Sequence, residues 1–124
     1  MDAPENKLKT ALKAGKTQIG CWFNLADTMG AEIVGRAGFD WVLIDGEHGP
    51  NGIRDIAHQL QALEGLPTSS VVRAPIGEAA IIKQFLDAGA QSLLIPMVES
   101  ANEAHELIAA VRYPPVGKRG VGAF

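Results

Sequence analysis

The sequence predicts an α/β fold in which a parallel sheet is covered by helices. Four short apolar segments alternate with four amphipathic segments of helical period, and one further helical segment precedes them all. Such alternation is typical of parallel strands joined by right-handed helical crossovers. The segments 37–45 and 88–96 both run from a helix stop into an apolar strand, which indicates a repeated unit. Two architectures remain open: a doubly wound sheet and part of a (βα)8 barrel.

The individual elements follow from periodicity. Strands are predicted where apolar residues run together without a helical period, at 18–23, 41–44, 71–73 and 92–97. The second of these, WVLI, is apolar on both faces, as expected for a strand covered on both sides. Helices are predicted where apolar residues recur every three or four positions, over 5–14 and 28–37, after Asn51, before Gly89 and after Ser100.

Capping residues set the expected helix starts. Asp27 and Asn51 are suited to accept hydrogen bonds from first-turn N–H groups. Ser100 and Glu103 have the S-x-x-E spacing of a capping box. The inner face of that last helix is expected to carry Ala104, Leu107, Ile108 and Val111.

Composition limits the functional classes. The chain has 124 residues, 47% of them hydrophobic, and a net charge of −3, which excludes disordered, collagen-like and disulfide-scaffold proteins. Lone Cys21 can form no internal disulfide, as in proteins of a reducing compartment. No apolar run approaches the ~20 residues of a membrane span, and the polar start does not resemble a signal peptide. We therefore expect a cytoplasmic protein that binds neither membranes nor, lacking a basic stripe, nucleic acid.

Both candidate architectures place their functional sites at the carboxyl ends of the strands. Acids, one imidazole and one guanidinium collect there, a set suited to chemistry on a small anion. No glycine-rich phosphate loop of a known nucleotide-binding pattern is present. We call the carboxyl ends of the strands, with the loops that follow them, the rim. The residues predicted at the rim are Trp22, Asn24, Asp27, Asp45, Glu47, His48, Arg73 and Glu99.

The segment from Asp45 to Pro50, DGEHGP, is the most informative part of the rim. Its glycines allow close approach of the backbone to a ligand, and the pKa typical of histidine, ~6.5, makes His48 a candidate proton carrier. The competing interpretation is a solvated turn. Arg73 could bind a carboxylate through two parallel hydrogen bonds and stabilise an enolate. A structural salt bridge to Asp45 is the alternative.

Lysine positions discriminate between carbonyl mechanisms. A Schiff base needs a desolvated lysine near a strand end, and the lysines lie in or beside the first helix, on a later helix or in the C-terminal segment. Carbonyl chemistry here would therefore need a metal ion to polarise the carbonyl group. Asp87, in the last turn of a helix, is opposed by the helix dipole, although an exposed carboxylate tolerates that cost.

Four segments resemble the HpcH/HpaI aldolases, the group of 2-keto-3-deoxy-L-rhamnonate and 4-hydroxy-2-oxoheptanedioate aldolases. The resemblance implies a (βα)8 TIM barrel of the phosphoenolpyruvate/pyruvate superfamily, of which residues 1–124 would be the amino-terminal half, with 113–124 leading onward. It also implies a metal-dependent, class II aldolase. The segments are GFDWVLIDGEHGPN (38–51), VVRAP (71–75), IKQFLDAGAQSLLIPMV (82–98) and RYPPVGKRGVG (112–122).

Roles follow from the resemblance by position. His48 resembles the general base, and Arg73 the residue that contacts pyruvate and stabilises the transition state. Asp87 resembles the aspartate that raises the basicity of the histidine, Asp45 an acid near the base, and Trp22 an aromatic wall of the pocket. The implied partners are pyruvate and a small aldehyde, joined or separated in 2-keto-3-deoxy or 4-hydroxy-2-oxo acids of sugar-acid or aromatic catabolism. The implied assembly is a homo-oligomer, a trimer or hexamer.

Helix geometry adds one expectation about Asp87. About 11 residues at 1.5 Å each would carry it some 16 Å from the rim, beyond the reach of its own His48. We therefore predict that Asp87 supports His48 of a neighbouring subunit, at an interface. A hydrogen bond of Asp87 within its own chain would contradict this prediction.

The metal site is not expected in this sequence. The resemblance implies a divalent cation, Mg²⁺, Mn²⁺ or Co²⁺, bound by acids after the fifth and sixth strands, and only four strands are predicted here. No residue present is assigned as a metal ligand. A catalytically silent half-barrel that serves as an assembly or binding module is therefore the alternative function, because its free strand edges favour association.

Overall fold

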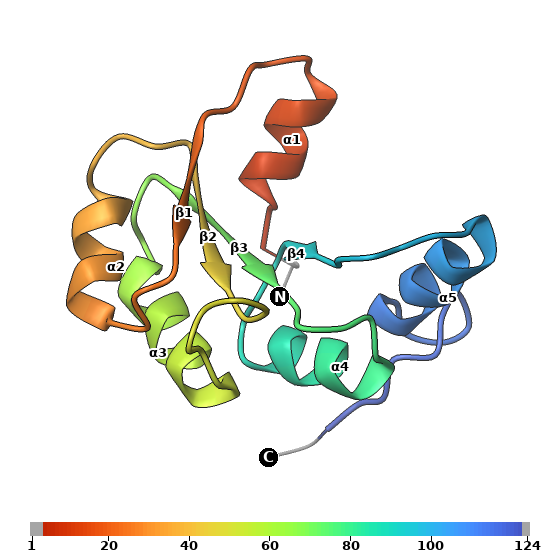
Figure 1. Ribbon diagram of the computed structural model, residues 1–124. Coiled ribbons are helices and arrows are strands. Elements are labelled where there is room, and N and C mark those ends of the chain that lie inside the picture. The colour runs from red at the N-terminus through yellow and green to blue at the C-terminus, as the bar shows by residue number, and fades with distance from the viewer. Residues whose placement is uncertain (1–3, 123–124) are drawn as a thin grey trace.

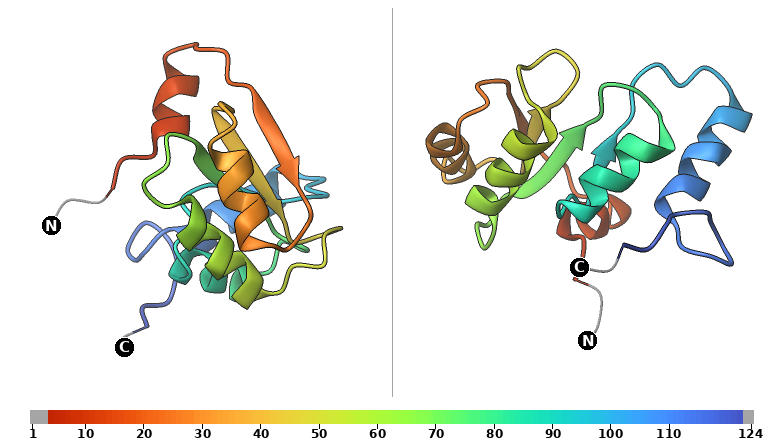
Figure 2. Two further views of the ribbon diagram at one scale, coloured as in Figure 1. Left: turned by 90° about the vertical axis from the view of Figure 1, so that its left-hand side faces the viewer. Right: turned by 90° about the horizontal axis from the view of Figure 1, so that it is seen from below.

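The computed structural model describes residues 4–122, in which four parallel strands form one sheet. The strands are β1 (Gly20–Phe23), β2 (Trp41–Asp45), β3 (Ser69–Arg73) and β4 (Leu93–Leu94). The helices are α1 (Lys7–Lys13), α2 (Thr28–Gly35), α3 (Ile53–Leu63), α4 (Ala79–Asp87) and α5 (Ala101–Val111). Helices α2 to α5 follow the four strands in turn and cover one side of the sheet, whereas α1 lies toward the end where the strands begin (Figures 1 and 2).

Strand order decides between the two predicted architectures. The strands are neighbours in the order β1-β2-β3-β4. A doubly wound sheet reverses its strand order at a switch point, whereas successive strands of a (βα)8 barrel lie side by side. The sheet is therefore an arc of a barrel, and the doubly wound alternative is wrong.

The centre of the arc is fully buried. Val42, Leu43, Ile44 and Asp45 of β2 have no exposed surface, because β1 and β3 flank the strand and side chains cover both of its faces. On the helix side, Ile56 of α3 and Phe85 of α4 belong to the same core cluster. A carboxylate at the end of so apolar a strand must find compensating partners.

The observed elements are shorter than predicted at several ends. The first helix covers Lys7–Lys13 rather than 5–14, the first strand begins at Gly20, and α2 stops at Gly35. The largest difference is β4, which pairs only through Leu93 and Leu94 instead of running over 92–97. Met97 has a left-handed backbone, with φ of 54°, which no extended strand tolerates.

One predicted N-cap, Asn51, differs in the structure. The N-cap of α3 is Gly52, whose N–H donates to the Asp55 carboxylate at 2.9 Å. Asn51 instead donates from its amide nitrogen to the Asp45 carbonyl oxygen and accepts a hydrogen bond from Gln59. The predicted cap residue thus joins the end of β2 to α3.

The capping box of α5 is only half formed. The Glu103 N–H donates to Ser100 Oγ at 3.1 Å, as predicted. The Glu103 carboxylate, however, accepts from the Glu99 N–H rather than from that of Ser100. Ile108, predicted on the inner face, is exposed, and Ala110 is the buried residue of this helix. The last helix therefore lies on the arc with less of its apolar face covered than its sequence predicts.

The sheet has two free edges. Among the described residues, β1 pairs only with β2 and β4 only with β3. No regular element follows α5 within the described part of the chain. Residues 123 and 124 of the predicted onward segment lie outside the described residues. No helix of residues 4–122 is long and apolar enough to span a bilayer.

Candidate functional site

The carboxylate of Asp45 is the centre of the rim. Parallel pairing of β2 with β3 places Asp45 directly beside Arg73, so both side chains leave the sheet at the same level. The carboxylate has no exposed surface, and each of its oxygens accepts three hydrogen bonds. Oδ1 accepts from the backbone N–H groups of Glu47 and His48 and from Arg73 Nε, and Oδ2 from Trp22 Nε1, Asn24 Nδ2 and Arg73 Nη2.

Arg73 binds the Asp45 carboxylate through two parallel hydrogen bonds. Its Nε lies 2.8 Å from Oδ1 of Asp45, and its Nη2 lies 2.6 Å from Oδ2. The guanidinium also lies over the ring of Trp22, 5.1 Å from its centroid. Both sequence interpretations of Arg73 are therefore compatible, because the salt bridge uses Nε and one N–H of Nη2. It leaves the second N–H of Nη2 and the N–H groups of Nη1, which lies beside Glu47. The two hydrogen bonds to Asp45 hold the remaining N–H donors of Arg73 in a fixed orientation.

The same contacts keep both Asp45 and Arg73 in their charged forms. The hydrogen bonds from Arg73, then those from the backbone of Glu47 and His48 and from Trp22, hold the pKa of the Asp45 carboxyl far below its usual range, against the opposing effect of burial. The Asp45 carboxylate in turn raises the pKa of Arg73, with a smaller contribution from Glu47. The pair is thus ionised throughout the physiological range.

This depressed pKa predicts a pH dependence of stability. A carboxyl that is more acidic when folded contributes stability above its unfolded pKa, ~3.9, and loses it as the pH falls toward the folded value. Unfolding by urea at pH 7, 5 and 3 should therefore show a constant difference between wild type and Asp45→Asn from pH 7 to 5, and a smaller difference at pH 3. A difference that does not change down to pH 3 would contradict the assignment.

Gly46 makes the turn at the rim possible. Its N–H donates to the Arg73 carbonyl oxygen at 2.9 Å, which extends the β2–β3 ladder past Asp45. A Cβ at this position would lie 2.7 Å from that oxygen, closer than real Cβ atoms approach backbone. Glycine therefore lets the chain turn immediately after Asp45 and bring the next two residues back over the carboxylate.

Glu47 and His48 form the outer part of the site. The Glu47 side chain is 14% exposed, and its Oε2 lies 2.8 Å from Arg73 Nη1. The His48 imidazole is 73% exposed, and its Nε2 lies 3.7 Å from Oε1 of Glu47. The Glu47 carboxylate thus lies between an exposed imidazole and a fixed guanidinium, an arrangement in which His48 could take a proton from an anion bound by Arg73.

Asp87 does not join this group, which corrects its predicted role. It is the last residue of α4, and its Oδ1 accepts a hydrogen bond from Arg119 Nη2 at 2.7 Å. Arg119 also lies over the ring of Tyr113, 4.7 Å from the centroid. A hydrogen bond within its own chain is the result stated above as contradicting support of a neighbouring His48. The helix-dipole cost noted for Asp87 is offset by this guanidinium.

The described residues do not form a metal site. No three His, Cys, Asp or Glu side chains of residues 4–122 gather into a group that could hold a metal ion. Both oxygens of Asp45 are already fully engaged with hydrogen-bond donors, which makes this carboxylate a poor ligand. This part of the chain therefore does not fit the divalent cation by itself.

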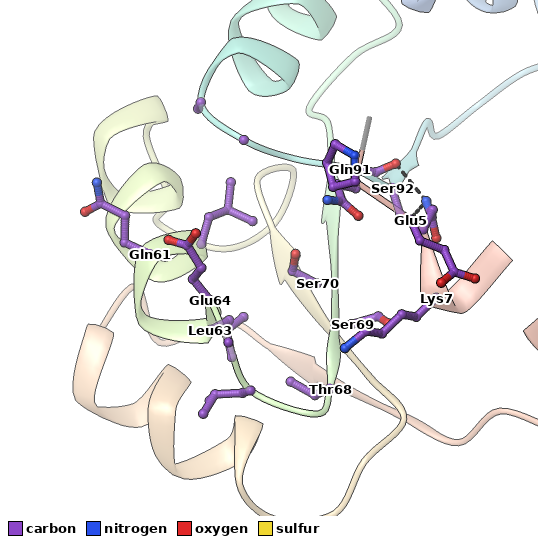
Figure 3. A pocket seen from close by; sticks show the side chains of 17 residues that line it. Glu5, Lys7, Gln61, Leu63, Glu64, Thr68, Ser69, Ser70, Gln91 and Ser92 are labelled. Atoms are coloured by element: carbon purple, nitrogen blue, oxygen red, sulfur yellow. Dashed lines mark hydrogen bonds between the residues drawn. The ribbon is translucent and has the colours of Figure 1, made fainter. Parts of the chain in front are cut away.

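A cavity of about 460 Å³ lies at the other end of the strands (Figure 3). It is bordered by Glu5 and Lys7 near α1, by Glu64 after α3, and by Ser69 and Ser70 at the start of β3. None of the rim residues named above borders it. The rim site is thus a surface arrangement, separate from this cavity.

The structure brings together four of the predicted site residues, Trp22, Asp45, His48 and Arg73, and leaves Asp87 elsewhere. Two further residues join them, for which the sequence predicted a place on the rim without a role. Asn24 donates to Asp45, and Glu47 contacts both Arg73 and His48. Their position just after a strand end was the signal that could have identified them.

Comparison with known proteins gives the family. The sequence pattern of the HpcH/HpaI aldolase/citrate lyase family matches residues 18–123. The chain belongs to this family. It is 58% identical over 123 residues to a hydroxypyruvate/pyruvate aldolase of Agrobacterium fabrum, covering 99% of this chain and 46% of that protein. It is 54% identical over 119 residues to a 4-hydroxy-2-oxo-heptane-1,7-dioate aldolase of Salmonella arizonae, covering 96% of this chain and 45% of that protein.

Solved structures agree with the HpcH/HpaI assignment. A family member from Burkholderia cenocepacia superposes with a TM-score of 0.90 at 39% identity, over 95% of this chain and 49% of that one. Macrophomate synthase superposes with a TM-score of 0.78 at 30% identity, over 91% of this chain and 39% of that one. The chain thus spans about half the length of the relatives it matches, and its fold is a partial barrel of their superfamily.

Proposed function

We propose that this HpcH/HpaI chain contributes the proton-transfer and anion-binding half of a class II pyruvate aldolase. The reaction makes or cleaves the bond between pyruvate enolate and a small aldehyde, in 2-keto-3-deoxy or 4-hydroxy-2-oxo acids. The observation that carries the proposal is that one buried carboxylate, Asp45, fixes both the Arg73 guanidinium and the backbone of His48, whose imidazole is exposed. The names of the relatives support the same chemistry.

Each residue has a distinct task in this proposal. Arg73, held through Nε and Nη2, offers its remaining N–H groups to the carboxylate of pyruvate and to the enolate oxygen as charge develops there. His48 takes the proton from C3 of pyruvate, and the electron pair of the broken C–H bond forms the enolate. The enolate carbon then attacks the carbonyl carbon of the aldehyde, and the C=O electron pair moves to oxygen as an alkoxide, which takes a proton from the His48 imidazolium or from water. Cleavage is the reverse sequence, in which His48 returns the proton to C3.

Local charge supports a cation requirement. Two carboxylates, of Asp45 and Glu47, surround one guanidinium, so the group carries a net charge of −1 before an anion arrives. We therefore include a divalent cation, Mg²⁺, Mn²⁺ or Co²⁺, in the proposal. Its ligands would lie in the part of the family's chain that this sequence does not cover. A homo-oligomer, a trimer or hexamer, and a cytoplasmic location complete the proposal.

Exchange of the C3 protons of pyruvate tests this function directly. We expect deuterium exchange, followed by NMR, in a chain of family length supplied with Mg²⁺, Mn²⁺ or Co²⁺, and none in residues 1–124 alone. Absence of exchange in the longer chain with all three metals would contradict the aldolase proposal and favour the silent assembly module, for which the free edges of β1 and β4 are the supporting feature. Exchange by residues 1–124 alone would show that the metal site is complete here.

A further inference from the structure

The carboxylate that lies beside His48 is that of Glu47. Its Oε1 is 3.7 Å from Nε2 of the imidazole, in the same turn of the chain. The carboxylate first predicted to support the histidine, that of Asp87, is bonded to Arg119. Within residues 4–122, the Glu47 carboxylate is thus the acid whose contact with His48 the structure shows.

Glu47 is held in place from two directions. Its backbone N–H donates to Asp45 Oδ1 at 3.0 Å, which fixes the turn. Its Oε2 lies 2.8 Å from Nη1 of Arg73 in an ion pair. That contact lacks the alignment of a hydrogen bond, so Oε2 is buried with no hydrogen-bond partner among the described residues. The carboxylate is therefore fixed, ionic and not saturated by donors.

We propose that Glu47 is a positioning residue that acts through His48, an inference that rests on the proposed aldolase function. When His48 takes the C3 proton of pyruvate, the imidazole becomes an imidazolium with N–H groups on both nitrogens. The carboxylate of Glu47 then faces the Nε2–H of the imidazolium, whose positive charge is shared by both ring nitrogens, and Nδ1 is the nitrogen that receives the proton. The carboxylate stabilises the charged form that the reaction creates, without itself gaining or losing a proton.

The charges around the pair determine the size of the effect. Arg73 contacts the other oxygen of Glu47, and Asp45 balances Arg73 through its two hydrogen bonds. The imidazole is mostly in solvent, so the interaction with Glu47 is weakened by water. Two unit charges about 4 Å apart in water interact strongly enough to change an equilibrium about fivefold.

The test compares Glu47→Gln with wild type in pyruvate C3 exchange, using the chain of family length with its metal. We expect kcat for exchange to fall about fivefold and KM for pyruvate to stay within about twofold. Glu47→Asp, which keeps the charge, should restore part of the loss. Glu64→Gln is the matched control, since it removes the same charge from an exposed position after α3, at the opposite end of the strands.

Salt separates an electrostatic role from a structural one. At about 1 M ionic strength the screening length falls to about 3 Å, so the difference between wild type and Glu47→Gln should shrink. If the fall in kcat caused by Glu47→Gln persists at high salt, or if Glu64→Gln lowers kcat equally, the inference is overturned.

The KM for pyruvate distinguishes an action of Glu47 on His48 from an action on Arg73. A raised KM with unchanged kcat would also overturn the inference and place the action of Glu47 on Arg73. An active wild type with unchanged Glu47→Gln would overturn this inference alone. An inactive wild type would overturn the proposed function and this inference with it.

Discussion

Asp45→Asn should destabilise the protein by about 3 kcal/mol, the lower end of the range for breaking a buried ion pair. The amide places an NH₂ group where an oxygen now accepts three hydrogen bonds, so donors face donors, and the guanidinium of Arg73 loses its bidentate partner. The lower end applies because Glu47 remains beside Arg73. Urea denaturation at pH 7, with secondary structure followed by circular dichroism, measures the change.

Two companion variants make this result specific. Glu32→Gln removes an exposed carboxylate that pairs with Arg36 one turn along α2, and should cost about 0.5 kcal/mol or less. The double variant Asp45→Asn with Arg73→Met removes the unpaired charge, so it should be more stable than the sum of the two single losses predicts. Strict additivity of the two losses would show that the pair is not coupled.

His48→Ala should lower C3 exchange at least about a hundredfold in the chain of family length, to the level of the background reaction. No other described imidazole contacts the rim carboxylates, so no other histidine is placed to take the proton. The side chain is 73% exposed and contributes little packing, so the unfolding midpoint in urea should stay close to that of wild type.

His58→Ala and His105→Ala are the matched controls. Both imidazoles are exposed, on α3 and α5, and their removal should leave exchange unchanged. Global unfolding of His48→Ala would show that the histidine has a structural role instead. Retained exchange in a folded His48→Ala would mean that another group removes the proton.

The order of the elements could be predicted because it depends on local pattern. The run WVLI and the periodic apolar residues of α3 and α4 mark the faces that are buried in the structure. Such apolar periodicity can be recognised in the sequence without knowing which segments meet. The end of β4 could not be predicted this way. Its sequence LLIPM is apolar enough for a strand, yet pairing with β3 stops at Leu94, and the left-handed backbone at Met97 leaves no mark on the hydrophobic pattern.

The sequence predicted which residues lie at the rim, but not which of their side chains contact one another. Asp45, His48 and Arg73 follow strand ends, and parallel strands bring their carboxyl ends together. Asp87 was assigned by resemblance, and its partner Arg119 is 32 residues away, a pairing that no local rule predicts. Glu47 lies next to His48 in the sequence, yet its contact with Arg73 depends on the turn that Gly46 allows.

The sequence by itself determined the alternation of strands and helices, the family and the rim that carries His48 and Arg73, because each depends on residue type and spacing. Only the tertiary structure decided the sequential order of the sheet, the partner of each carboxylate and the acid that lies beside the histidine. Strand order and charge pairing depend on which distant segments meet and at what register. Those contacts are fixed by packing across the whole sheet, which spacing along the chain does not encode.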